Sequence, residues 1–130
     1  MEGMGEVKAG SGAFDLPISF PRRIGDPDGG TSPEELVAAA HGACYAMALN
    51  AHVGRKEGAI RRTRITCTVT AERGEGGIRI TNSKLHVVAE GLTGIDVKDF
   101  PTVAKEAEGR CPVSNALRAN VTIDVEAEAV

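Results

Sequence analysis

An apolar segment near the middle of the chain, ELVAAAHGACYAMALNAHV at residues 35–53, constrains the fold more than any other feature of the sequence. Helix-start signals precede it: Ser32 is a favoured N-cap, Pro33 suits the first helical position, and Glu35 completes a capping box with Ser32. Gly54 follows the segment, at a position where a C′ glycine would end the helix. The sequence therefore predicts one helix, roughly 30 Å long at a rise of about 1.5 Å per residue.

This central helix carries almost no polar surface. Between Leu36 and Leu49 the only clearly polar side chain is His41. A helix that is apolar on all sides is buried on all sides, and a chain of 130 residues offers little surface to cover it. We therefore expect a second copy of the chain to pack against this helix.

Shorter elements surround the central helix, and alternation of apolar and polar residues marks the strands. Ile65, Cys67 and Val69 share one face of a strand, and the GEGG sequence at 74–77 predicts a hairpin turn. The order of elements predicts a single α+β domain over residues 1–130 with a mainly antiparallel sheet. The expected elements are one or two short strands in residues 1–20, a loop at 22–32, the central helix, strands at 61–71 and 78–89 with a β-bulge near Asn82, a helix capped by Asp99 with Pro101 in its first turn, a short helix at 112–118 and a strand at 121–127.

Charge and composition weigh against a nucleic-acid-binding protein. The chain has 15 Lys and Arg against 18 Asp and Glu, a net charge of −3, whereas DNA-binding domains usually carry a basic excess. Aromatic residues make up 3% of the chain, too few for a platform on which bases stack. Five basic residues cluster along the sequence, and such clusters are mostly solvated loop or strand faces. They are Arg55, Lys56, Arg61, Arg62 and Arg64.

The sequence also predicts a soluble protein. No apolar run reaches the roughly 18 residues expected of a membrane span. Glu2 and Glu6 stand where a signal peptide would carry Lys or Arg before an apolar core. We therefore expect a cytoplasmic protein with no membrane partner.

Cys111 is the cysteine with the most reactive surroundings. It precedes Pro112, which suits the first position of a helix and makes Cys111 the N-cap. A thiol there meets free backbone N–H groups and the positive end of the helix dipole, and Arg110 lies next to it. Cysteine is a poor N-cap by propensity, so its presence favours a function for the thiol over a purely structural cap.

The other two cysteines lie within apolar patterns. Cys67 alternates in phase with Ile65 and Val69, which indicates a core position. Cys44 lies in the middle of the central helix, and His41, three residues earlier, shares its face. The sequence leaves open whether Cys44 fills the core or reacts, and whether His41 polarises the thiol or is a satisfied core histidine.

Two motifs resemble the OsmC/Ohr family of organic hydroperoxide reductases. TSPEELVAAAHGACYAMAL resembles the central-helix signature of that family, and GRCPVSNAL resembles its second cysteine motif. The HGAC and SFPRRIG stretches are closer to the OsmC branch, although the chain lacks the tryptophan that the family's first strand usually carries. The resemblance implies an OsmC-like fold, in which mainly antiparallel sheets pack around a long central helix, and an intertwined homodimer.

The resemblance also implies roles for individual residues. Cys44 would be the peroxidatic cysteine and Cys111 the resolving cysteine, and Glu34 of PEEL would match the active-site glutamate. RRIG offers Arg22 and Arg23 for the active-site arginine, and the count along SFPRRIG favours Arg23. The arginine would stabilise the Cys44 thiolate, and Glu34 would hold the arginine through a bidentate pair.

The implied activity is a thiol-dependent peroxidase that acts on organic hydroperoxides and more weakly on hydrogen peroxide. A thiolate attacks the peroxide and becomes a sulfenic acid, which the second thiol converts to a disulfide. A dithiol reductant, such as a lipoyl protein, would restore the pair by exchange. The chemistry needs no metal and no other cofactor.

The spacing of the implied site residues bears on the oligomer. Glu34 and Cys44 are ten positions apart, roughly 15 Å along a helix. The Glu34–Arg23 pair of one chain therefore cannot easily reach its own Cys44. Two antiparallel copies of the central helix would bring each pair to the cysteine of the other chain.

Two alternatives use the same residues differently. A non-catalytic OsmC-like domain would bind a small apolar ligand at the dimer interface, with structural cysteines. A metal protein would use His41, Cys44, Cys111 and His52, although His52 lies two turns beyond Cys44 and away from its face. Thiol-dependent consumption of hydroperoxide and metal analysis separate these alternatives from the peroxidase.

Overall fold

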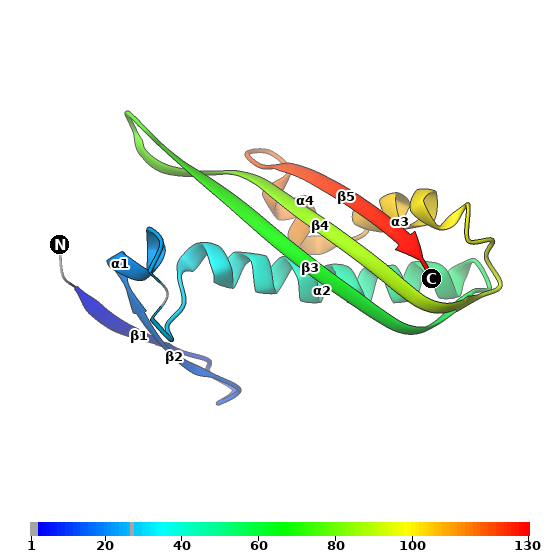
Figure 1. Ribbon diagram of the computed structural model, residues 1–130, viewed down its shortest axis with the longest axis horizontal. Coiled ribbons are helices and arrows are strands. Elements are labelled where there is room, and N and C mark those ends of the chain that lie inside the picture. The colour runs from blue at the N-terminus through cyan, green and yellow to red at the C-terminus, as the bar shows by residue number, and fades with distance from the viewer. Residues whose placement is uncertain (1–2, 27) are drawn as a thin grey trace. The chain divides into compact units, whose positions relative to one another are not determined.

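The computed structural model describes residues 3–26 and 28–130. The chain divides into two compact units, Met1–Val37 and Ala38–Val130, whose elements are labelled in Figure 1. The central helix, α2 (Pro33–Arg55), begins in the first unit and continues in the second. Within the described residues, no helix is long and apolar enough to cross a membrane.

The first unit contains an antiparallel hairpin. β1 (Met4–Lys8) pairs with β2 (Asp15–Ser19), which confirms the prediction of short strands in residues 1–20. α1 (Phe20–Arg23) follows β2 directly and occupies the start of the segment expected to be a loop. Pro21 lies in its first turn, where the fixed φ angle of proline suits a helix and its missing N–H is not needed.

The start of α2 makes the contacts expected from its sequence. Ser32 Oγ accepts a hydrogen bond from the backbone N–H of Glu35 at 3.1 Å, so Ser32 is the N-cap. The Glu35 carboxylate accepts a hydrogen bond from the Thr31 hydroxyl at 2.6 Å. The predicted capping box is thus half formed, with Thr31 as the donor to Glu35 in place of the Ser32 N–H.

The prediction that Gly54 ends α2 is wrong. The helix continues to Arg55, and the chain turns away at Glu57, whose φ angle is +60°. The N–H of Glu57 donates to the carbonyl of Gly54, and the N–H of Gly58 donates to the carbonyl of Val53, both at 3.0 Å. These two bonds form a Schellman motif, in which the residue with the left-handed conformation follows the carbonyl groups that accept the two bonds. Glu57 takes that conformation, and Gly54 remains helical.

A three-stranded sheet, in the order β3–β4–β5, forms the scaffold of the second unit (Figure 1). β3 (Ala59–Gly74) and β4 (Gly77–Thr93) are antiparallel and meet at the predicted hairpin turn. β5 (Thr122–Ala129) runs parallel to β4. Among the described residues, two of the three pairings between strands are antiparallel, and the sheet of the second unit is mixed.

The predicted β-bulge is present in the hairpin. Thr70 pairs with Asn82, whereas Ala71 pairs with Ile80, so Thr81 is an extra residue in β4. The bulge reverses the alternation in β4 at the position where the sequence changes phase. The part of β4 between the hairpin turn and the bulge and the part after the bulge therefore direct their apolar residues to the same side of the sheet.

Two helices fill the connection between β4 and β5, because parallel strands require a crossover. α3 (Phe100–Glu108) begins after Asp99, which occupies the predicted N-cap position without a capping hydrogen bond from its side chain. α4 (Pro112–Leu117) confirms the predicted short helix. The Tyr45 hydroxyl donates a hydrogen bond to the carbonyl of Ala104 at 2.7 Å and thereby joins α2 to α3.

One face of α2 packs into the core of the second unit. Gly42 faces β3, where an added Cβ atom would make an ordinary van der Waals contact of 3.5 Å with the Cβ of Cys67. The fully or nearly buried residues of α2 recur at helical spacing and are His41, Tyr45, Leu49, His52 and Val53. Of these, Tyr45, Leu49 and Val53 pack in one core cluster with residues of β4, α3 and the start of α4. The other members of the cluster are Leu85, Val87, Ala89, Phe100, Val103, Ala104, Ala107 and Cys111.

The opposite face of α2 is apolar and uncovered in the single chain. Met47 is 75% exposed, and Ala40, Ala43 and Ala51 are also exposed. These four residues, which follow each other at helical spacing, are called the alanine–methionine face below. We expected α2 to be buried on all sides. Within a single chain, only one of its faces is buried.

Candidate active site

Cys44 lies on α2, one turn after His41, and is partly buried. Burial raises the pKa of the Cys44 thiol, the backbone N–H of Val113 lowers it by hydrogen bonding, and the neighbouring Cys111 thiol raises it again. Within the single chain, this balance favours the protonated thiol. Cys44 also packs against the buried core cluster that contains Cys111.

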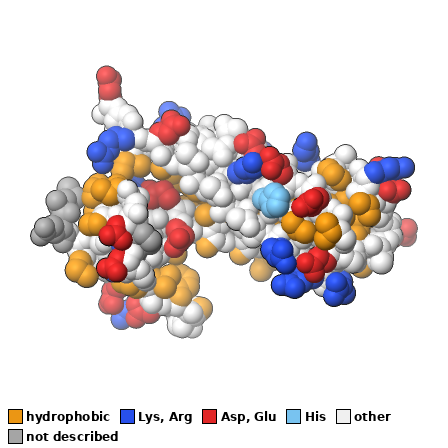
Figure 2. Space-filling model, viewed as in Figure 1, with side chains coloured by type: hydrophobic (Ala, Val, Ile, Leu, Met, Phe, Trp, Pro, Cys, Tyr) orange, Lys and Arg blue, Asp and Glu red, His pale blue; other side chains and the backbone are white. Residues whose placement is uncertain are grey.

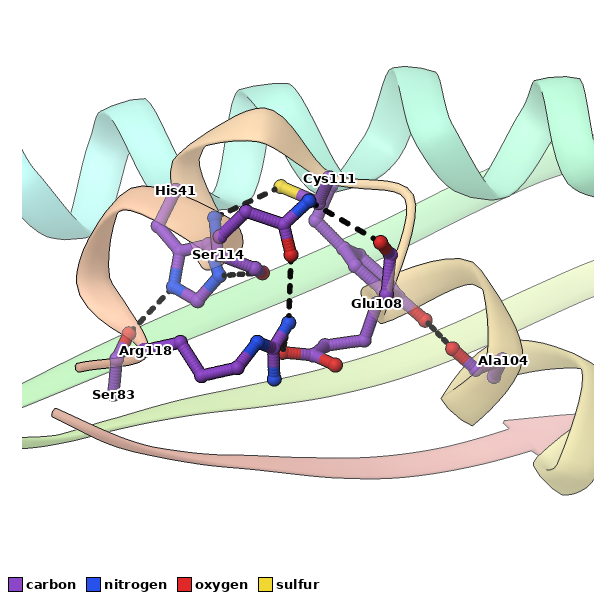
Figure 3. A network of polar contacts seen from close by, with 10 residues as sticks. His41, Ser83, Ala104, Glu108, Cys111, Ser114 and Arg118 are labelled. Atoms are coloured by element: carbon purple, nitrogen blue, oxygen red, sulfur yellow. Dashed lines mark hydrogen bonds and ion pairs between the residues drawn. The ribbon is translucent and has the colours of Figure 1, made fainter.

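Cys111 is the N-cap of α4, as its sequence predicts (Figure 3). The N–H of Ser114 donates a hydrogen bond to Cys111 Sγ at 3.4 Å, and the Cys111 side chain is fully buried. The N–H of Cys111 donates to the carbonyl of Glu108 at 3.1 Å. Arg118 lies at the end of α4 and forms an ion pair of 2.8 Å with the Glu108 carboxylate. The thiol is therefore fixed between the end of α3 and the start of α4.

His41 is fully buried, and both of its ring nitrogens are hydrogen-bonded. Nδ1 lies 2.6 Å from the Ser83 hydroxyl, and Nε2 lies 2.6 Å from the Ser114 hydroxyl (Figure 3). Burial lowers the pKa of His41, the Glu108 carboxylate raises it in part, and Arg118 lowers it further. A neutral ring with two serine partners is a satisfied core histidine, which resolves the alternative left open by the sequence.

Cys67 lies on β3 and is partly buried, but its surroundings are more polar than its apolar pattern suggests. Its Sγ lies 3.3 Å from the Ser83 hydroxyl and 3.9 Å from His41 Nδ1. Burial raises the pKa of the Cys67 thiol, the hydrogen bond to Ser83 lowers it, and Cys111 raises it. Cys67 therefore lies at one end of a polar chain that continues through Ser83 and His41 to Ser114.

The first unit contains the other two residues implied by the resemblance. Arg23 Nε and Nη2 lie 2.8 Å and 2.7 Å from the same oxygen, Oε1, of Glu34. The second oxygen, Oε2, is buried without a hydrogen-bond partner among the described residues. The pair is thus held by one carboxylate oxygen rather than by the expected two. Arg22 instead donates to the backbone carbonyl of Asp28 at 3.3 Å.

The structure thus brings the predicted site residues together in two pairs. Cys44 and Cys111 pack in the same core cluster of the second unit, and Arg23 bonds to Glu34 in the first. The sequence analysis missed Ser83 and Ser114, which flank His41. Ser83 precedes the buried Leu85 by two positions on β4 and so lies on the same, buried face of the strand. A polar residue at a core position was therefore the one indication in the sequence that Ser83 has a polar partner.

The residues of the metal alternative have other partners. His52 Nε2 lies 2.9 Å from Glu106 Oε2, and Lys56 Nζ lies 2.9 Å from the same oxygen. Both nitrogens of His41 contact serines. Over the described part of the chain, no three His, Cys, Asp or Glu side chains converge in a way that could hold a metal ion.

Comparison with known proteins gives consistent matches over almost the whole chain. Peroxiredoxin OsmC of Escherichia coli is 34% identical over 126 residues, which cover 95% of this chain and 86% of that protein. An organic hydroperoxide resistance protein of Xanthomonas axonopodis pv. citri is 30% identical over 92% of this chain and 82% of its own length. The crystal structure of OhrB of Bacillus subtilis has a TM-score of 0.76 at 25% identity and covers 98% of both chains. The family described as OsmC-like protein matches residues 25–126, and the chain belongs to this family.

Proposed function

We propose that the protein is a cysteine-based peroxidase that reduces organic hydroperoxides, with Cys44 as the peroxidatic residue and Cys111 as the resolving residue. The observation that carries this proposal is that Cys44 of α2 packs against the core cluster that contains Cys111, the N-cap of α4. Relatives named peroxiredoxin and organic hydroperoxide resistance protein support a peroxidase activity.

The chemistry proceeds in two steps at these sulfurs. The Cys44 thiolate attacks the distal oxygen of the hydroperoxide, the O–O bond breaks, and the alkoxide leaves and takes up a proton to become an alcohol. Cys111 then attacks the resulting sulfenic acid, so that an S–S bond forms, the S–O bond breaks, and water leaves. A dithiol reductant returns both cysteines to thiols by two exchange reactions and becomes a disulfide itself.

The first step requires a positive group near Cys44, because burial and Cys111 raise the pKa of its thiol. The cation that we assign to this role is Arg23, which Glu34 orients through two contacts to one oxygen. Glu34 and Cys44 are ten positions apart, roughly 15 Å along a helix, so we assign the Arg23–Glu34 pair of one chain to the Cys44 of a second chain. Each active site would then contain residues from two copies.

Two uncovered apolar surfaces support the homodimer. The alanine–methionine face of α2 is exposed in the single chain, and Met47 is 75% exposed. In the described residues of the first unit, no hydrophobic side chain is fully buried, and Met4 and Ile24 are 81% and 60% exposed. Figure 2 shows hydrophobic side chains at the surface of this unit, on the left. So small a unit without a core of its own needs a covering surface, and a second copy supplies one. We expect an interface above about 2,000 Å², as in obligate dimers.

The residues around Cys44 indicate the preferred substrate. Ala40, Met47 and Ala48 are its apolar neighbours at helical spacing on α2. An apolar wall favours the carbon chain of an organic hydroperoxide over the small and well-hydrated hydrogen peroxide. We place the activity in the cytoplasm, where a dithiol reductant such as a lipoyl protein would reset the enzyme.

The test is hydroperoxide turnover with dithiothreitol, in which cumene hydroperoxide is compared with hydrogen peroxide. We expect turnover of both, faster with cumene hydroperoxide, and complete loss in Cys44→Ser. Cys67→Ser is the matched control and keeps near-normal activity, because the thiol of Cys67 takes no part in either step. Cys111→Ser should accumulate a Cys44 sulfenic acid, visible by mass spectrometry after one equivalent of peroxide. No turnover by the wild type would leave only a non-catalytic role, and a Cys44–Cys67 disulfide would contradict the assignment of Cys111.

A further inference from the structure

The buried polar chain around His41 connects α2, the helix that carries Cys44, with the segment that carries Cys111. His41 and Cys44 lie on the same face of α2, one turn apart. His41 Nε2 contacts the Ser114 hydroxyl at 2.6 Å, and the N–H of the same Ser114 donates to Cys111 Sγ at 3.4 Å. α2 thus carries both Cys44 and His41. Figure 3 shows the His41 ring in contact with Ser114, next to Cys111.

α4 is short and has few other side-chain contacts: Val113 packs against the core, and the Asn115 amide donates to the carbonyl of Gly109 at 3.2 Å. It spans six residues, well below the length at which a helix is stable by itself, and its N-cap is a cysteine, a residue that caps weakly. Arg118 is bonded to Glu108 and to Asn115 at the surface, with about half of its side chain exposed. Ser114 is the residue of α4 that is fully buried, and its hydroxyl bonds to His41.

We propose that His41 is a positioning residue for the resolving step, which holds the first turn of α4, and with it the Cys111 thiol, against Cys44 through its Nε2 contact with Ser114. This inference rests on the proposed function. Disulfide formation demands a narrow geometry, with Cβ atoms about 3.8 Å apart. A shift of about 1 Å in a reacting group is enough to slow a step by about a hundredfold.

The contact between His41 and Ser83 holds the imidazole ring in place and does not act on Cys111 directly. Nδ1 lies 2.6 Å from the Ser83 hydroxyl on β4, and that hydroxyl also contacts Cys67. The sheet therefore fixes the orientation of the ring, and Nε2 transmits this orientation to α4. Both nitrogens of His41 lie 2.6 Å from hydroxyl groups, and the nearest thiol, that of Cys67, is farther away, at 3.9 Å from Nδ1. The role we assign to His41 is therefore to orient its neighbours rather than to accept the proton of a thiol.

Two substitutions separate the functions of the two nitrogens. The amide of His41→Gln reaches the position of Nε2 and can bond to Ser114, whereas the amide of His41→Asn reaches the position of Nδ1 and can bond only to Ser83. We expect His41→Gln to resolve like the wild type. We expect His41→Asn to form the disulfide about tenfold or more slowly. Ser114→Ala removes the same contact by deleting one oxygen, and should slow the same step even if His41→Asn fails to fold.

The experiment is a single turnover of the reduced homodimer with one equivalent of cumene hydroperoxide. Dimedone traps the Cys44 sulfenic acid, and mass spectrometry follows the adduct and the Cys44–Cys111 disulfide over time. The proposal predicts that His41→Asn and Ser114→Ala accumulate the adduct, while the rate at which the Cys44 thiol is lost stays within about twofold of the wild type, because the positioning argument concerns only the second step.

The outcomes distinguish this inference from the proposed function. If the wild type forms neither adduct nor disulfide, the peroxidase itself is contradicted, and this inference with it. If the wild type reacts but His41→Asn and Ser114→Ala resolve as fast as the wild type, only the role of His41 is contradicted. If His41→Gln and His41→Asn slow both steps equally, His41 merely supports the fold.

Discussion

Burial determines the protonation state of His41 and should make the stability of the protein depend on pH. The ordinary pKa of histidine is 6.5, and burial lowers that of His41 in the folded protein. Below about pH 6.5 the unfolded chain binds this proton more readily than the folded chain, so the free energy of unfolding decreases as the pH falls. Above that pH, His41 is neutral in both states and contributes no pH dependence.

Urea unfolding at pH 7.5 and pH 5.5, at one fixed protein concentration, measures this effect. We expect a smaller loss of stability at the lower pH in His41→Gln than in the wild type, because the variant has no proton to take up. His86→Gln, which alters an exposed ring on β4, is the matched control and should behave like the wild type. An unchanged pH dependence in His41→Gln would contradict a neutral buried ring.

Some residue-level features follow from the sequence and others do not. The N-cap role of Cys111 was predictable because Pro112 marks the start of a helix. The contacts of His41 were not, because Ser83 and Ser114 lie 42 and 73 positions away along the chain, and only the fold brings them to the ring. The sequence therefore left two interpretations of His41 open.

At the scale of elements, the end of α2 stores strain in one residue. Glu57 adopts a φ angle of +60°, a conformation that costs a residue with a side chain roughly 1 kcal/mol more than glycine. Glu57→Gly should therefore raise the free energy of unfolding by up to about 1 kcal/mol. Gly58→Ala is the opposing control, since a Cβ there would lie 2.7 Å from the Ile95 side chain, and should destabilise the protein. Thermal unfolding of both variants checks the pair, and a destabilising Glu57→Gly would contradict the account of this helix end.

The sequence predicted the start of α2 better than its end. A Ser–Pro–Glu–Glu start carries its capping groups in the local sequence, and Ser32 forms the predicted bond. A glycine near a helix end is weaker information, because Gly54 fits inside the helix as well as after it. The direction of β5 depends on the path of the crossover through α3 and α4, which no local pattern in β5 itself determines.

At the scale of the whole molecule, the two pairs of site residues lie in different units of the chain. The sequence indicated the dimer through the apolar character of α2, and the exposed alanine–methionine face agrees with that argument. The sequence could not predict which surfaces of the two chains meet, because an apolar pattern shows that a face is covered but not by which surface. The assignment of Arg23 and Glu34 to the Cys44 of another chain remains the central proposal.

Complementation between two inactive variants tests this proposal most directly. Cys44→Ser and Arg23→Ala are unfolded, mixed and refolded together, and the mixed dimers are isolated by means of different affinity tags. If each site takes Cys44 from one chain and Arg23 from the other, a mixed dimer has one site with both defects and one site with neither. The account predicts that turnover of cumene hydroperoxide returns to about half of the wild-type value per dimer. Mixed dimers that form but stay inactive, or a wild type that is a stable monomer, would contradict the composite site.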